Sequence, residues 1–211
     1  VLAIGRNPQS AEKASAQLKS ALVETGDATE AGTARKAIDR CIQHFGTFDG
    51  LYHVAGGSGR RFGDGPLHEI TAEGWEYTMK LNLTSLMFSN QAAVTSFMSQ
   101  KKAGTILNVG SVLGLSPSPR YFATHAYSAA KSAAIGFTRS VAAYYAPHDI
   151  RINLLAPALV ETPMAQRAAN DEKILSFIKT KQPLDGGRIG SPGDLDGAAV
   201  VEGRAHPVRL R

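Results

Sequence analysis

The sequence predicts an α/β protein whose parallel sheet is doubly wound and covered by helices on both faces, in three layers. Strand and helix patterns alternate along the chain, and the strand segments are short, continuous apolar runs. Such runs are typical of strands buried on both faces. Because no repeat or change in composition divides the 211 residues, we expect one domain over residues 1–195 and a divergent or disordered tail over residues 196–211.

Five strands and five helices are expected in alternation. The strands cover residues 1–4, 23–27, 51–55, 105–109 and 151–155. The helices cover residues 8–22, 31–45, 71–98, 124–145 and 164–180. Asn7 and Pro8 suit the N-cap and first position of the first helix. Gly46 suits a left-handed C-terminal end of the second helix, and Thr71 suits the N-cap of the third helix. Pro157 ends the last strand.

Composition excludes several classes of protein. The net charge of +5 comes from scattered Lys and Arg residues, with short pairs only at Arg60-Arg61 and Lys101-Lys102, so a solvated surface is favoured over a nucleic-acid site. The single cysteine, Cys41, excludes a disulfide framework and a cysteine-based zinc site, and we expect no metal. No apolar run is long enough to span a membrane, and no secretory signal is visible, so we expect a cytoplasmic protein.

Residues suited to chemistry follow the strands. Parallel sheets bind ligands where the carboxyl ends of their strands meet. The residues just past those ends are Gly5 and Arg6, Asp27, residues 55–57, Ser111 and Pro157. The order of the strands therefore predicts one crevice that collects these positions.

Tyr127 and Lys131 lie four residues apart in an expected helix, so their side chains share one face. A nearby ammonium lowers the pKa of a phenol from about 10, which gives a group able to donate or accept a proton near neutral pH. A surface pair without function is the simpler interpretation of the spacing alone.

Two further polar residues agree with that chemistry. Ser111 follows a strand and offers a hydroxyl that can bind a substrate oxygen, although a turn serine would look the same. Asn82 lies between two leucines in an expected helix, although asparagine is a poor helix former, so its presence there needs an explanation. The simplest explanation is a buried amide whose hydrogen bonds are satisfied.

In this order and spacing the residues resemble the short-chain dehydrogenase/reductase family, and within it the 3-oxoacyl-(acyl carrier protein) reductases, over about residues 1–195. Residues 54–57 are similar to its Asn-Asn-Ala-Gly turn, with His53 and Val54 in place of the asparagines. Residues 127–131 match its Tyr-x-x-x-Lys pattern, and residues 153–163 resemble its nicotinamide segment, with Ala158 in place of glycine.

The resemblance implies a Rossmann-like fold and hydride transfer between a nicotinamide cofactor and a ketone or secondary alcohol. It assigns Tyr127 as the general acid or base, and Lys131 as the group that lowers the pKa of Tyr127 and binds the nicotinamide ribose. It implies that Ser111 binds the substrate oxygen and that Asn82 takes part in a proton relay. It also implies a homodimer or homotetramer. Further cofactor contacts are implied for Ala55, Gly56, Pro157, Val160 and Thr162.

Arg6 bears on the choice of cofactor. Enzymes that prefer NAD place an acid at the end of the second strand of the fold, where this chain has Gly5 and Arg6. A guanidinium there suits a 2′-phosphate, so NADP(H) is favoured and NAD(H) remains possible. The resemblance places Asp27 and Ala28 beside the adenine.

The chain also departs from the family pattern. The family's first strand and its glycine-rich turn are not found, which should leave apolar surface and unpaired backbone groups exposed at the sheet centre. A degenerate or truncated relative acting as a non-catalytic binding module is the alternative function. A serine hydrolase fits poorly, because Ser111 lacks the Gly-x-Ser-x-Gly turn. The substrate stays open among 3-oxoacyl thioesters, sugars, steroids and simple ketones.

Overall fold

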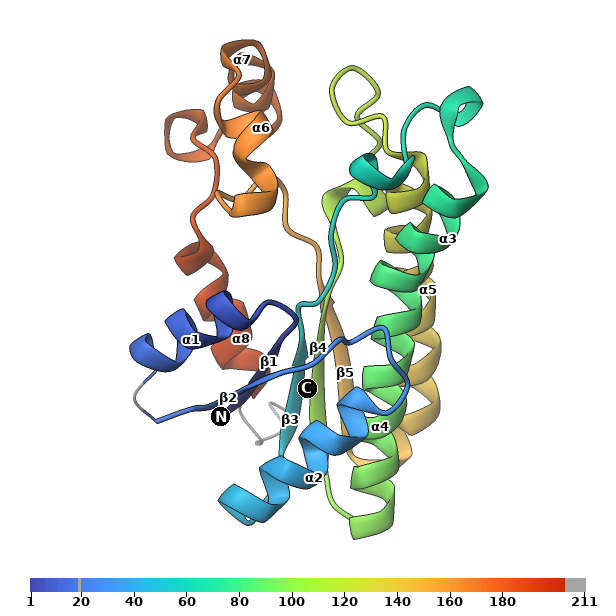
Figure 1. Ribbon diagram of the computed structural model, residues 1–211, viewed down its shortest axis with the longest axis vertical. Helices are drawn as coiled ribbons and strands as arrows, with labels where there is room; N and C mark the ends of the chain where they lie inside the picture. The colour runs from blue at the N-terminus through green and yellow to red at the C-terminus, as the bar shows by residue number, and fades with distance from the viewer. Residues whose placement is uncertain (19, 204–211) are drawn as a thin grey trace, which may run out of the picture.

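The computed structural model describes residues 1–18 and 20–203, and all five of its strands run parallel (Figure 1). The strands are β1 (Leu2–Gly5), β2 (Leu22–Thr25), β3 (Gly50–His53), β4 (Gly104–Val109) and β5 (Ile150–Leu155). They form two sheets, β1-β2 and β3-β4-β5. The expected α/β fold with parallel strands is confirmed.

Helices cover both faces of the strands (Figure 1). One layer holds α1 (Pro8–Gln17) and α8 (Asp196–Gly203), and α8 packs on β4. The other holds α2 (Thr33–Phe45), α3 (Ala72–Met79), α4 (Ser85–Gln100) and α5 (His125–Tyr145). Within the described residues, no helix has the length and apolar character needed to cross a bilayer.

The main core lies between the three-stranded sheet and helices α2 and α4. Phe97 is fully buried and stacks on Phe48, with ring centroids 5.0 Å apart and planes 9° from parallel. Gly104 makes this possible, because a Cβ at that position would lie 2.4 Å from the Phe97 ring. The remaining buried members are Ile38, Ala93, Val94, Ile106, Ile150 and Ile152.

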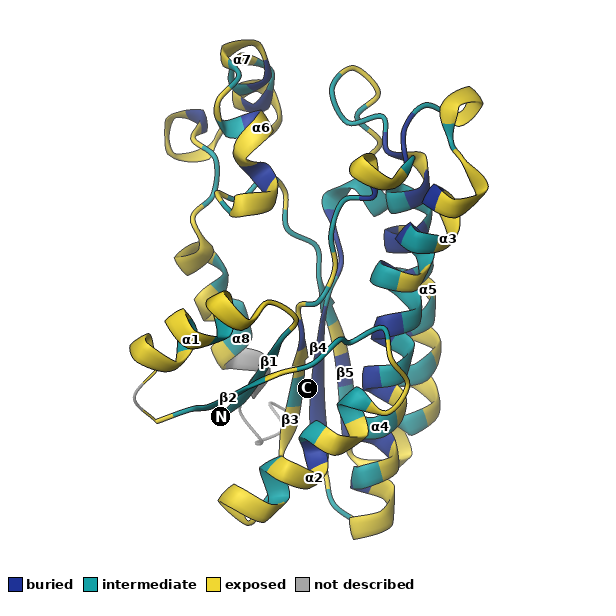
Figure 2. Cartoon of the chain, in the orientation of Figure 1, coloured by how far each residue is buried: buried dark blue, intermediate teal, exposed yellow. Residues whose placement is uncertain are grey.

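The two sheets are not hydrogen-bonded to each other in the described part of the chain, since β1 pairs only with β2 and β3 only with β4. Figure 2 colours part of β3 as exposed. Side chains at β3 and just beyond it are correspondingly accessible, Tyr52 to 45% and Val54 to 57%. This agrees with the expected exposure at the sheet centre.

Several expected elements differ in detail. The helix expected over residues 8–22 ends at Gln17, and Leu22 already belongs to β2. The helix expected over residues 71–98 contains a π-helical turn, Lys80–Thr84, between α3 and α4. The helix expected over residues 164–180 is divided into α6 (Gln166–Ala169) and α7 (Glu172–Lys181), because the Asp171 side chain caps a new helix. The tail expected from residue 196 begins with helix α8, which follows a capping box of Ser191 and Asp194; residues 204–211 lie outside the described residues.

His53 is a buried histidine at the end of β3, only 4% exposed. Its Nδ1 lies 3.1 Å from the Ser89 hydroxyl, which itself donates to the Ser85 carbonyl. The other ring nitrogen, Nε2, is buried and has no hydrogen-bond partner among the described residues. Burial, and then the charge of Lys131, lower the pKa of His53 to about 4.

This histidine predicts a loss of stability in acid. The unfolded chain takes up a proton near pH 6.5 but the folded chain only near pH 4, so the free energy of unfolding should fall by up to about 3 kcal/mol between those values. Urea titrations of wild type and His53→Asn across this range should show the loss in the wild type alone. His68→Asn, at an exposed histidine, is the control, and an equal acid loss in His53→Asn would refute the assignment.

Candidate functional site

The four residues expected to be catalytic lie near one another at the carboxyl end of the three-stranded sheet. Ser111 follows β4 directly, while Tyr127 and Lys131 lie in the first turns of α5. Asn82 lies in the π-helical turn between α3 and α4. Ser111, Asn82 and Lys131 are buried and Tyr127 is half-buried, so the polar groups meet in a largely dry environment.

Tyr127 is hydrogen-bonded to Ser111, and its chemistry differs from the expectation. Burial raises the pKa of Tyr127, and the Ser111 hydrogen bond opposes this only in part. The expected lowering by Lys131 is not found, because the Lys131 Nζ lies 5.6 Å from the centre of the phenol ring and donates elsewhere. Tyr127 is therefore a protonated acid at neutral pH.

Lys131 is a buried ammonium, 3% exposed. Its Nζ donates to the Val109 carbonyl at 2.8 Å, just where β4 ends. Burial lowers its pKa to about 8, so it remains mostly charged at pH 7. An ammonium has three donors, and the hydrogen bond to Val109 uses one, which leaves donors for a ligand hydroxyl.

Asn82 fixes the turn that follows β3. Its Oδ1 accepts from the Gly57 N–H at 3.0 Å, and its Nδ2 donates to the Gly57 and Thr78 carbonyls at 2.9 Å each. The preceding residue, Gly56, lies against both Asn82 and Lys131: a Cβ there would be 2.9 Å from Asn82 Oδ1 and 3.4 Å from Lys131 Nζ. The simpler interpretation of Asn82 as a satisfied buried amide is correct, and the amide also positions this turn.

Asp64 is a buried carboxylate that the sequence reasoning missed. Its two oxygens accept from the backbone N–H groups of Ala126 and Tyr127, each at 3.0 Å. A negative group at a helix N-terminus is stabilised by the helix dipole. Asp64 therefore anchors the start of α5 beneath the tyrosine. The only sequence signal that could have indicated a role for Asp64 is its position in a glycine-rich loop.

The expected cofactor residues fall into two groups. Arg6 and Asp27, which follow the neighbouring strands β1 and β2, approach to 3.9 Å, and Arg6 also contacts Tyr77. Asp27 accepts from the Thr29 N–H, so Ala28 lies in a tight turn beside it. This group lies on the two-stranded sheet.

The second group lies on the three-stranded sheet. Ala55 and Gly56 follow β3, and the Pro157 carbonyl accepts from Val112 beside Ser111. Val160 bridges to Gly190, and the Thr162 hydroxyl donates to the Val160 carbonyl at 3.5 Å.

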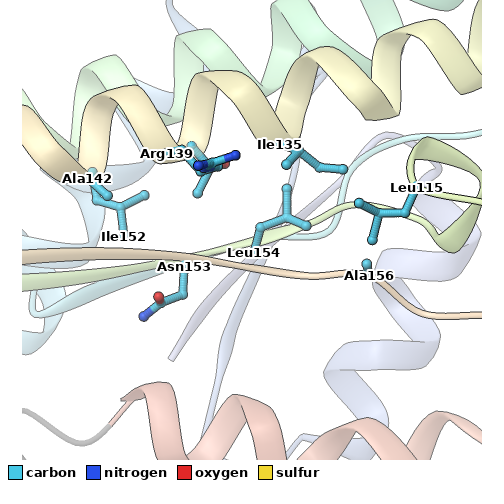
Figure 3. A pocket seen from close by; sticks show the side chains of 9 residues that line it. Leu115, Ile135, Arg139, Ala142, Ile152, Asn153, Leu154 and Ala156 are labelled. Atoms are coloured by element: carbon cyan, nitrogen blue, oxygen red, sulfur yellow. The ribbon is translucent and has the colours of Figure 1, made fainter. Parts of the chain in front are cut away.

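A cavity of about 520 Å³ lies elsewhere, between α5 and β5 (Figure 3). Ile135 from α5 and Leu154 from β5 point toward one another across it, and Asn153 points away from α5. None of the four catalytic candidates lines it. The site is therefore defined by the converging polar side chains and not by this cavity.

Known proteins share this fold and about a third of the aligned residues. The chain is 34% identical to 2-dehydro-3-deoxy-D-gluconate 5-dehydrogenase of Escherichia coli, over 77% of this chain and 61% of that protein. It is 32% identical to the inactive 2-(S)-hydroxypropyl-CoM dehydrogenase 2 of Xanthobacter autotrophicus, over 95% of this chain and 85% of that protein. The chain thus spans less than two thirds of the length of the Escherichia coli relative.

A solved structure and a family model agree with these relatives. The gluconate 5-dehydrogenase from Burkholderia cenocepacia, crystallised with NADP and tartrate, superimposes with a TM-score of 0.84 at 25% identity, over 97% of this chain and 78% of that one. The family model described as enoyl-(acyl carrier protein) reductase matches residues 1–201. With the parallel α/β fold, these matches show that the chain belongs to the short-chain dehydrogenase/reductase family.

Proposed function

We propose that the chain interconverts a ketone and a secondary alcohol with a nicotinamide cofactor, with NADP(H) favoured. The observation that carries the proposal is the meeting of Ser111, Tyr127 and Lys131 beside the Asn82-anchored turn. Family membership supports the reaction class, since the chain belongs to a family of oxidoreductases. The cofactor would supply the hydride when bound.

The residues present fit such a cofactor. Lys131 keeps donors for the two ribose hydroxyls next to the nicotinamide. Gly56 allows close approach beside it, because that position carries no side chain. At the other end, Arg6 directly precedes the N-terminus of α1, and both a guanidinium and a helix N-terminus favour a phosphate group.

The proton chemistry follows from the pKa of Tyr127. Its raised pKa keeps the hydroxyl protonated at neutral pH, so Tyr127 can give a proton to a substrate oxygen that becomes an alkoxide. The Ser111 hydroxyl would hold that oxygen in place. In the reverse direction the phenolate must form first, so oxidation is favoured by higher pH.

Replacing Tyr127 by Phe tests the acid. Because general acid catalysis contributes roughly 10²–10⁴ in rate, kcat for ketone reduction should fall by at least about a hundredfold. NADPH binding should persist, as measured by nicotinamide fluorescence. Tyr144→Phe is the control, since Tyr144 is an exposed tyrosine of the same helix. Full activity in Tyr127→Phe would refute the assignment.

Replacing Arg6 by Asp tests the cofactor preference. The acid would repel a 2′-phosphate and accept from a 2′-hydroxyl, so the preference for NADPH over NADH should reverse. The ratio of the two dissociation constants, measured by fluorescence titration, reports this directly. Arg35→Asp, at an exposed arginine of α2, is the control. An unchanged ratio in Arg6→Asp would show that the preference lies elsewhere.

The alternative, a non-catalytic binding module, has one specific observation in its favour: a relative matched over most of the chain is an inactive dehydrogenase. It predicts a folded chain that binds cofactor but reduces no ketone. A panel of ketones with NADPH therefore separates the two functions.

A further inference from the structure

Two arginines from distant parts of the chain converge on one backbone oxygen. The Arg60 Nη2 donates to the Tyr121 carbonyl at 3.2 Å, and the Arg167 Nη2 donates to the same oxygen at 3.0 Å. Arg60 belongs to the short helical turn Arg60–Phe62, and Arg167 to α6. We call this pair the arginine site. The Arg167 guanidinium also lies 5.7 Å from the centre of the Phe122 ring, which helps to orient it.

The arginine site carries positive charge that no described acid neutralises by an ion pair within 4.0 Å. Partial burial and the charge of Arg167 lower the pKa of Arg60, and the charge of Asp64 opposes this, although the Arg60 side chain remains exposed overall. Both oxygens of Asp64 already accept from α5. Both arginine side chains are exposed and share one neutral carbonyl, so an anion bound between them would offset the mutual repulsion of the two cations.

The guanidinium groups keep most of their hydrogen-bonding capacity. Each guanidinium has five N–H donors, and the hydrogen bonds to the Tyr121 carbonyl use one from each arginine. A carboxylate matches this geometry, because its two oxygens accept paired N–H groups from the planar fork.

The arginine site is connected to the catalytic candidates through the segments that hold it. Tyr121 lies in the segment that connects Ser111 to Tyr127, and packs with Phe122 against the small core of α6 and α7. Arg60 lies in the same loop as Asp64, whose carboxylate binds the Tyr127 N–H. A substrate held between Ser111 and Tyr127 can extend along this segment toward the two arginines.

We propose that Arg60 and Arg167 bind a carboxylate group of the substrate, so that the enzyme acts on oxo acids and their hydroxy-acid products. The oxo-acid reaction rests on the proposed function, whereas binding of a carboxylate by the two arginines does not. It assigns the loop at residues 59–67 and helix α6 a shared task, since each supplies one of the two cations.

The test compares an acid with its uncharged ester. Binding of 4-oxopentanoate and of methyl 4-oxopentanoate to the full chain is measured by calorimetry, with and without NADP⁺. The acid should bind at least tenfold more tightly than the ester, and its affinity should fall as NaCl is added. Equal affinity for the two compounds, or no binding of either, would overturn the proposal.

Single substitutions separate recognition from loop structure. Arg60→Gln and Arg167→Gln keep a donor for the Tyr121 carbonyl but remove the charge, so each should weaken acid binding at least tenfold and leave ester binding unchanged. Arg61→Gln, at the exposed neighbour of Arg60, is the matched control and should change neither. Equal weakening of acid and ester would mean that the arginines only hold the loops, and the proposal would be wrong.

The same compounds distinguish this proposal from the proposed function. Tight, arginine-dependent binding of the acid without oxidation of NADPH would refute the reaction and keep the binding site. Equal reduction of acid and ester would keep the reaction and refute the carboxylate site. If a Gln variant fails to fold, as judged by thermal unfolding, Arg60→Lys and Arg167→Lys retain the charge, and they should retain the preference for acid over ester.

Discussion

The site depends on the hydrogen bonds of one buried amide, that of Asn82. It binds both the N–H and the carbonyl of Gly57, so the turn after β3 has a single position relative to helices α3 and α4. That position places Gly56 against Lys131, and the Lys131 ammonium in turn binds the end of β4. Buried polar groups joined in this way specify one geometry, because leaving any one of them unpaired is costly.

The division of the strands into two sheets separates the tasks of the molecule. The main core and all four catalytic candidates belong to the three-stranded sheet and the helices that cover it. Arg6 and Asp27 lie on the two-stranded sheet, which has few buried side chains of its own. The catalytic candidates are therefore positioned by a well-packed core, while Arg6, the expected phosphate contact, is positioned by a two-stranded sheet with little core of its own.

Much of this arrangement was predictable from the sequence, because the strands are continuous apolar runs and parallel strands bring their carboxyl ends together. The four catalytic candidates lie in or just after helices and strands with a clear hydrophobic pattern, so their proximity could be predicted from the fold. Asp64 could not be found in this way, since its contact with Ala126 joins residues 62 apart in the sequence. Arg60 and Arg167 could not be paired from the sequence for the same reason, because both bind the Tyr121 carbonyl from residues 61 and 46 positions away. The raised pKa of Tyr127 depends on burial, which spacing alone does not give.

The central claim is that these residues hold a nicotinamide cofactor beside Tyr127. The most direct measurement is a titration of the 211-residue chain with NADPH, following nicotinamide fluorescence, in wild type and Lys131→Met. We expect micromolar binding by the wild type and at least tenfold weaker binding by the variant, because Lys131 would lose its hydrogen bonds to ribose. A folded wild-type chain that binds no NADPH, or a variant that binds as tightly, would contradict this account.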